Sequence, residues 1–199
     1  MLRVNKMKFG KIILLIICLV LSLPSFAHAE LQGILYKDSV VTEDGESFNL
    51  ADFDKTLREG NIAEAESIYT EWLKRRQAML KNGTEFGILD MALKHCHAQI
   101  LYARKNYEEC IAAEEEVLEY LHAHLNEGHD RDFSWINQIF NSMRLQKLSY
   151  DEAKDPVGRI NSLLAQNRLV EFLESRLPAD NPQLLREKME LSKCYSKMD

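Results

Sequence analysis

The sequence contains few cysteines. There are four in 199 residues, and Cys18 lies in an N-terminal segment that we expect to be removed. The remaining three, Cys96, Cys110 and Cys194, are an odd number, so they cannot form a complete disulfide framework. We expect them to pack as small apolar residues. The alternative is a bridge between Cys96 and Cys110 across one helical hairpin.

The sequence also lacks the local motifs of common catalytic sites. It contains no nucleophile elbow, no phosphate-binding glycine loop and no dinucleotide fingerprint. Carboxylate pairs are abundant, but their abundance makes any single pair uninformative. We therefore predict a protein that is not an enzyme and that needs no cofactor.

Residues 1–29 are predicted to be a signal peptide. Basic residues precede an apolar run at 12–23, and Ala27-His28-Ala29 supplies the small-residue pattern that signal peptidase recognises. The run is too short to favour a stable membrane span. Cleavage after Ala29 would release the chain into the periplasm or the medium. Cys18 is not expected to be lipidated, because the bulky Ile17 precedes it.

Removal of the leader leaves few positive charges. It takes four basic residues and no acidic residue, which changes the formal net charge from −6 to −10. Nucleic-acid binding depends on Lys and Arg that neutralise phosphates, so a nucleic-acid partner is not expected. The same charge disfavours docking on an anionic lipid surface.

A short pattern occurs three times, at 60–65, 105–110 and 148–153, with separations of 45 and 43 residues. Each copy has a turn residue, an apolar or aromatic residue, acidic residues and a small residue, which is typical of a tight turn between two packed helices. A repeat of this length indicates an array of helical hairpins. Apolar spacing predicts helices at 50–57, 62–80, 86–104 (or 89–104), 107–125, 133–147, 160–177 and 184–198.

Two segments depart from the helical pattern. Residues 30–47 have no helical periodicity and are predicted to form an extended arm or a loose hairpin. Pro156 and Gly158 are expected to interrupt the second helix of the third copy. The helical domain is therefore assigned to residues 48–199.

The repeated residues resemble the tetratricopeptide repeat (TPR) family, in which small residues of two helices meet beside a turn. Phe53 and Asn141 depart from the family pattern at small-residue positions, and the period is longer than the usual length of about 34 residues, as in long-helix TPR variants. The residues that fit are Ala98, Leu101, Asn106, Tyr107 and Cys110 in the second copy, Gly60, Ala65 and Tyr69 in the first, and Phe140, Tyr150 and Ala153 in the third.

The resemblance implies an all-α fold, a right-handed superhelix of about three hairpins with a C-terminal capping helix. Its concave face, lined by the first helices, would receive a peptide or a partner helix. The residues at concave positions are His95, Gln99, Tyr102, Trp135, Gln138, Ser142 and Leu145. Core packing of Tyr102 and Trp135 is the alternative to this binding role.

Five histidines of the expected mature chain cluster around the second copy, namely His95, His97, His122, His124 and His129. Residues two apart point to opposite sides of a helix, and no H-E-x-x-H or C-x-x-C spacing occurs, so no metal ligand is assigned. An acidic set on the following helix is expected to form a solvated face. It comprises Glu108, Glu109, Glu114, Glu115, Glu116 and Glu119.

These observations favour a non-enzymatic adaptor or scaffold in the periplasm or cell envelope. Its expected partner is a protein or peptide that is itself exported or belongs to the envelope. The alternative function is a histidine-dependent metal-binding protein or metal-assisted enzyme, because the histidines are concentrated in one copy.

Overall fold

The structure is a computed structural model, which describes residues 40–41, 47–83, 87–125, 133–153 and 156–196. The described part is helical apart from two short strands. The elements are β1 (Val40–Val41), β2 (Ser47–Phe48), α3 (Leu50–Arg58), α4 (Ile62–Lys81), α5 (Ile88–Ala103), α6 (Tyr107–Leu125), α7 (Phe133–Ala153), α8 (Pro156–Glu174) and α9 (Pro182–Ser196).

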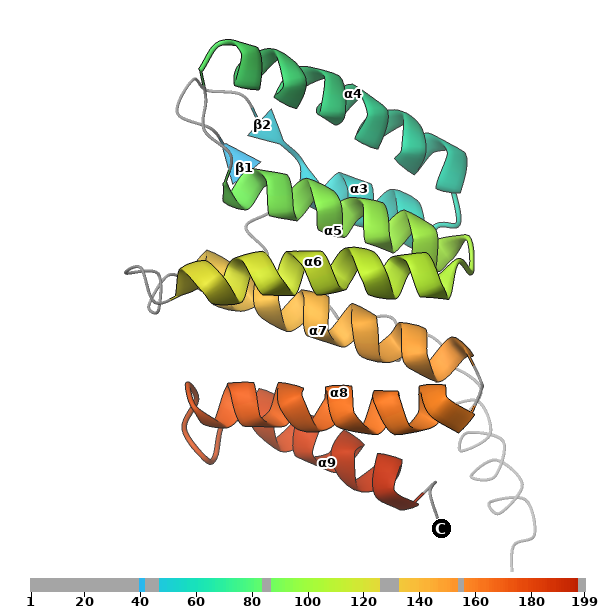
Figure 1. Ribbon diagram of the computed structural model, residues 1–199, viewed down its shortest axis with the longest axis vertical. Coiled ribbons are helices and arrows are strands. Elements are labelled where there is room, and N and C mark those ends of the chain that lie inside the picture. The colour runs from blue at the N-terminus through green and yellow to red at the C-terminus, as the bar shows by residue number, and fades with distance from the viewer. Residues whose placement is uncertain (1–39, 42–46, 84–86, 126–132, 154–155, 197–199) are drawn as a thin grey trace, which may run out of the picture. The chain divides into compact units, whose positions relative to one another are not determined.

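Each helix packs against the next one along the chain, from α3 to α9 (Figure 1). Short connections join these neighbours, so consecutive helices run in opposite directions. Helices α3 and α5 also contact each other, as do α5 and α7. The prediction of an all-α protein is confirmed for the described residues, and the predicted bounds of α6 agree with the structure.

The first two copies of the repeat form the same turn. Gly60 and Lys105 both have a positive φ, 80° and 64°. The N–H of Gly60 donates to Leu57 O at 3.0 Å, and the N–H of Lys105 donates to Tyr102 O at 2.9 Å. The following residues, Asn61 and Asn106, donate to carbonyls five positions earlier at 3.1 and 2.9 Å. These paired bonds are the Schellman ending of a helix, which needs a left-handed residue at its centre.

The third copy does not form a turn, so its predicted register is wrong. Helix α7 continues through 148–153 instead of ending near 147. Ser149 is fully buried, and its hydroxyl donates within the helix to Leu145 O at 2.9 Å. Because this hydroxyl is already hydrogen-bonded within the helix, it does not stabilise a turn at this position. The pattern that marks a turn in two copies is part of a helix in the third.

The predicted break at Pro156 is a helix start. Helix α8 begins at Pro156, four residues before the predicted segment, and includes Gly158. Proline is favoured in the first turn of a helix, where its missing N–H has no helical acceptor. Pro156 therefore marks the boundary between α7 and α8.

Two groups of buried side chains show how the described helices pack in the hydrophobic core. In the first, Phe48, Phe53 and Trp72 bring β2, α3 and α4 together, with ring centroids 5.8 Å and 5.5 Å from Trp72 to the two phenylalanines. In the second, Ala98 of α5 meets Cys110 and Ala113 of α6. Small side chains at this second contact let α5 and α6 approach closely, as the TPR resemblance implies.

Polar pairs are buried between consecutive helices as well. Arg76 of α4 forms a nearly buried ion pair with Asp90 of α5, with Nη2 2.6 Å from Oδ2. The Gln166 amide of α8 donates to the Glu187 carboxylate of α9 at 2.9 Å. The Ser162 hydroxyl of α8 donates to Asp151 of α7 at 2.6 Å.

The N-terminal part of the predictions is described only in part. Val40–Val41 pairs antiparallel with Ser47–Phe48, which agrees with the loose-hairpin alternative for that segment. The signal peptide and residues 30–39 lie outside the described residues. No helix of the described residues has the length and apolar character needed to cross a membrane.

Cys96 and Cys110 are both free thiols, so the Cys96–Cys110 bridge is not formed. Cys96 belongs to the first core group and Cys110 to the second. Their role as small packing residues is confirmed. Of the three repeat residues expected to be buried, Ala65 and Cys110 are fully buried, but Ala153 is only half-buried, consistent with the misplaced third turn.

Replacing Ala65 by leucine is expected to lower the free energy of unfolding by about 1 to 3 kcal/mol, because a larger side chain overpacks a filled core. Chemical denaturation measures this change. Ala63→Leu is a matched control on the exposed side of the same helix, where we expect a change below about 0.5 kcal/mol. Equal stability of the two variants would contradict the packing of Ala65.

Candidate functional site

The seven residues assigned to the concave groove do not share one open surface. His95, Trp135 and Ser142 are buried. Gln99, Tyr102, Gln138 and Leu145 are half-buried. The face of α7 that carries the last four groove residues, Trp135 to Leu145, packs toward the preceding hairpin, because Leu145 contacts the group formed by Ala98, Cys110 and Ala113.

These contacts limit what the assigned groove can do in the free chain. The three buried side chains cannot touch a ligand without a rearrangement. Gln99 is already engaged, since its amide donates to Asp54 Oδ1 at 3.2 Å. Tyr102 packs edge-on against Tyr107, and burial raises its pKa to about 12. The binding role of the set stays a prediction, and its half-buried members are the ones that remain accessible.

Trp135 packs against the end of α6. Its ring stacks on Tyr120 with centroids 6.2 Å apart and lies 6.4 Å from His124. Tyr120 and His124 stack on each other at 4.1 Å. Trp135 is only 6% exposed, so the core alternative describes this residue in the structure.

His95 and Glu114 form a buried pair between α5 and α6. Nδ1 of His95 lies 2.6 Å from Oε1 of Glu114, and Glu114 is fully buried. Its other oxygen, Oε2, has no hydrogen-bond partner among the described residues. The pair therefore ties the two helices together inside the protein.

The expectation that Glu114 lies on a solvated face is wrong. The other five acidic residues of the set are exposed, but Glu114 shares a helical face with Cys110, Val117 and Leu121, which are buried. Those residues stand four before and three and seven after Glu114, so the spacing itself held the signal.

The environment of this pair shifts two pKa values. Burial alone would lower the pKa of His95, but the carboxylates of Glu114 and Asp54 outweigh burial and raise it above its usual value. Burial raises the pKa of the neighbouring Cys96 thiol well above its usual value, and the same two carboxylates raise it further. Cys96 is therefore protonated near neutral pH and is a poor nucleophile.

Among the described residues, the remaining histidines do not form a metal site with His95 and Glu114. His97 stacks on Tyr69 at 5.4 Å, and His122 lies edge-on to Phe172 at 6.2 Å. Within the described ranges, no three His, Cys, Asp or Glu side chains are grouped so that they could hold a metal ion. His129 lies outside the described residues. The alternative function as a metal-binding protein therefore has no set of metal ligands among the described residues.

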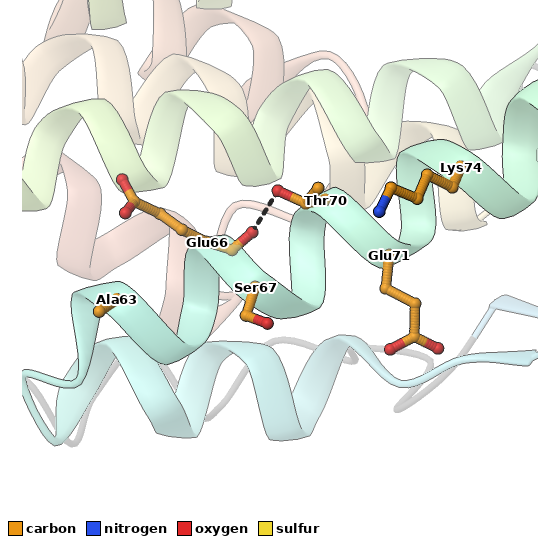
Figure 2. Close-up of a pocket in the computed structure, with 6 residues that line it drawn as sticks. All are labelled: Ala63, Glu66, Ser67, Thr70, Glu71 and Lys74. Atoms are coloured by element: carbon orange, nitrogen blue, oxygen red, sulfur yellow. Dashed lines mark hydrogen bonds between the residues drawn. The ribbon is translucent and has the colours of Figure 1, made fainter.

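One depression lies along α4 and is a weak candidate for a site. It encloses about 500 Å³, but Figure 2 shows that all six lining residues project from this one helix. Thr70 is bonded back to its own helix, since its hydroxyl donates to Glu66 O at 2.7 Å. A binding site needs groups that converge from several elements, and here none do.

A second hollow is lined by three helices, and we name it the α6–α8 cleft. Its volume is about 340 Å³. Helices α6 and α8 form its walls and α7 forms its floor. The lining residues are Glu115, Leu118, Glu119 and His122 of α6, Met143 and Gln146 of α7, and Ala165 and Arg168 of α8.

The α6–α8 cleft combines an apolar base with charged rims. Leu118, Met143 and Ala165 are buried apolar residues. Glu115 and Glu119 give the α6 wall two carboxylates, and Arg168 gives the α8 wall one guanidinium. Such a surface can hold an apolar side chain at its base and a basic group against α6.

One ionisable side chain that lines the α6–α8 cleft is held neutral near pH 7. Desolvation lowers the pKa of His122, and the positive charge of Arg176 lowers it further. The charge of the α6–α8 cleft therefore comes from two carboxylates and one guanidinium.

The α6–α8 cleft uses a different face of α7 from the one assigned to the groove in the sequence analysis. The groove assignment used Trp135 to Leu145, whereas the cleft uses Met143 and Gln146. Met143, Gln146 and Tyr150 follow each other at spacings of three and four, so they form a second stripe on α7. Helical spacing in the sequence could have revealed this stripe, but the residues that face it across the cleft come from two other helices, α6 and α8.

Comparisons with protein-family models, with curated proteins and with solved structures gave no match.

Trp135→Ala is expected to lower the free energy of unfolding by about 3 to 5 kcal/mol, because it leaves a cavity between α6 and α7. Thermal or chemical denaturation measures the loss. Tyr195→Ala serves as a control, since Tyr195 is an exposed aromatic residue and its removal should change stability by less than about 0.5 kcal/mol. A small effect at Trp135 would restore its assignment to an open groove.

The His95–Glu114 pair predicts a defined pH dependence. Because the folded state raises the His95 pKa, the pair stabilises the fold fully below the unfolded value of 6.5, and this stabilisation is lost as pH rises through the folded value. Glu114→Gln should remove this loss and lower stability most at acidic pH. Urea denaturation between pH 5 and 9 measures both effects.

Glu109→Gln is the matched control for this experiment, because Glu109 is exposed on the same helix. It should keep the pH profile of the original chain. If Glu114→Gln also kept the pH profile of the original chain, His95 would not be the group whose titration changes the stability.

Proposed function

We propose that this chain is a non-enzymatic adaptor of TPR-like architecture that acts after export, in the periplasm, at the cell envelope or outside the cell. It binds a segment of another exported or envelope protein. The α6–α8 cleft is the observation that carries the proposal, because it joins an apolar base to charged rims over three helices. Grooves of this kind suit extended or helical peptides.

The TPR-like arrangement is supported by two features. The turns at Gly60 and Lys105 have the same hydrogen bonds, and small residues meet where α5 packs on α6. Contacts between α3 and α5 and between α5 and α7 fit an array in which first helices of successive hairpins adjoin. The superhelical path itself is part of the proposal.

The charges of the α6–α8 cleft favour a particular type of partner segment. Glu115 and Glu119 would attract a lysine or arginine, and Arg168 on the opposite wall would favour an acidic residue or a chain-terminal carboxylate. The two rims would thus orient the segment across the cleft. An apolar residue of the segment would occupy the base formed by Leu118, Met143 and Ala165.

Affinity capture from envelope extracts tests this function with the purified exported chain as bait. The original chain should recover a reproducible protein partner. Reversing the α6 wall with Glu115→Lys and Glu119→Lys should weaken the purified complex about tenfold or more, because a favourable charge contact becomes repulsive. Surface plasmon resonance measures the affinity.

The matched control reverses two carboxylates elsewhere. Glu64→Lys with Glu71→Lys makes the same charge change at exposed positions of α4 and should leave the affinity unchanged. Failure of the folded original chain to recover any partner would count against the adaptor function. If both double variants weakened partner binding equally, the effect would come from the net charge of the chain and not from the α6–α8 cleft.

A further inference from the structure

His122 is the side chain of the α6–α8 cleft whose charge can change near neutral pH. Among the described residues that line the cleft, Glu115, Glu119 and Arg168 carry the fixed charges, and His122 is the one imidazole. Histidine ordinarily titrates between about pH 5 and 8, whereas carboxyl groups titrate near about pH 4 and guanidinium groups stay charged. His122 is exposed on α6, so a bound segment can reach it.

Three basic side chains gather around the ring of Phe172 on α8. His122 lies edge-on to this ring, with centroids 6.2 Å apart, and the Arg176 guanidinium lies 4.3 Å from the ring centroid. Arg168 stands four residues before Phe172, so it projects from the same side of α8. We name the group formed by His122, Arg168 and Arg176 the basic end of the cleft.

The carboxylates of the α6 wall precede the basic end. Glu115 and Glu119 stand seven and three residues before His122, so the three side chains share one side of α6. A helix rises about 1.5 Å per residue, which separates Glu115 from His122 by about 10 Å along the helix. The charges of the cleft are therefore ordered along α6, with the carboxylates first and the basic end last.

The third helix of the cleft adds no free charge beside His122. The lining residues of α7, Met143 and Gln146, are uncharged, and Lys147 is paired with Asp151 of its own helix at 2.6 Å. On α8, Glu171 adjoins Phe172 in sequence, so it points about 100° away around the helix. The charged groups that face His122 are thus the two carboxylates of α6 and the two arginines beside Phe172.

We propose that the α6–α8 cleft selects a partner segment with a basic and an acidic residue about two helical turns apart, and that His122 makes this binding depend on pH. The basic residue lies against Glu115 and Glu119, and the acidic residue lies at the basic end. Protonation of His122 adds a third positive charge to that end, so the segment binds more tightly as the pH falls. The inference rests on the proposed adaptor function, for which it names the charge order of the segment and the regulation.

The direction of the pH effect follows from linkage. Desolvation, and then the charge of Arg176, hold the pKa of His122 below 6.5, so the free cleft has a neutral imidazole at neutral pH. A bound carboxylate favours the imidazolium form, and protonation therefore favours the bound carboxylate by the same factor. A solvent-exposed ion pair contributes about threefold in affinity. This gain develops mainly below pH 6.5.

Two labelled helical peptides test the proposal. One carries lysine at i, leucine at i+4 and glutamate at i+7, and its twin carries glutamine at i+7. Fluorescence anisotropy measures their affinities for the full chain at pH 7.5 and 5.0. The affinity of the glutamate peptide relative to its twin should rise about threefold or more at the lower pH. Both peptides keep the lysine, so this ratio cancels any change at Glu115 and Glu119.

Three variants assign the response to His122. His122→Gln should keep the ratio of affinities the same at both pH values. His97→Gln changes an exposed histidine of α5 outside the cleft and should leave the threefold rise intact. Arg176→Gln should move the rise to higher pH, because the charge of Arg176 lowers the His122 pKa, whereas a purely structural role for His122 predicts no such movement. Circular dichroism checks that each variant is folded.

A ratio that does not change with pH, or one that still changes in His122→Gln, would overturn the proposal. If neither peptide binds, but affinity capture recovers a partner whose binding depends on Glu115 and Glu119, the adaptor function stands and this inference is wrong. If capture recovers no partner as well, both fail.

Discussion

Polar pairs buried between consecutive helices determine how the helices of this protein assemble. Arg76 with Asp90, His95 with Glu114, and Gln166 with Glu187 each join two neighbours. A buried ionic group without its partner destabilises a protein by several kcal/mol, about 3 to 5 in typical cases. Apolar faces could slide by one helical turn at small cost, but these pairs could not. They therefore favour one register where α4 meets α5, α5 meets α6 and α8 meets α9.

The sequence predicted the helices better than their contacts. Local signals such as apolar spacing and the Gly60-Asn61 turn depend on nearby residues only, and they located α6 and two of the turns well. Lys105 occupies a left-handed position that glycine would normally fill, and it was found only because its copy matched the first one. The third copy shows the limit of that reasoning. It matches the turn pattern in sequence, but the Ser149 hydroxyl is hydrogen-bonded within the helix and no turn forms there.

The candidate site was less predictable for a physical reason. Glu114 belongs to a run of acidic residues, and its burial depends on His95 on another helix. Likewise, the α6–α8 cleft exists only where three helices meet, so no one segment of the sequence contains it. Helical spacing could have indicated both features, but it does not say which helix covers which face.

The buried thiols act as chemical reporters of two helix contacts: Cys110 reports on the contact of α5 with α6, and Cys96 reports on the contact of α5 with α3 and α4. Cys96 and Cys110 are enclosed, and burial raises the pKa of Cys110 to about 12, so an alkylating reagent can reach them only when the helices separate. Cys194 of α9 is half-buried and belongs to neither of these two packing groups. The labelling rates of the three thiols in one unmodified chain therefore compare the opening of these two contacts with the accessibility of the C-terminal helix.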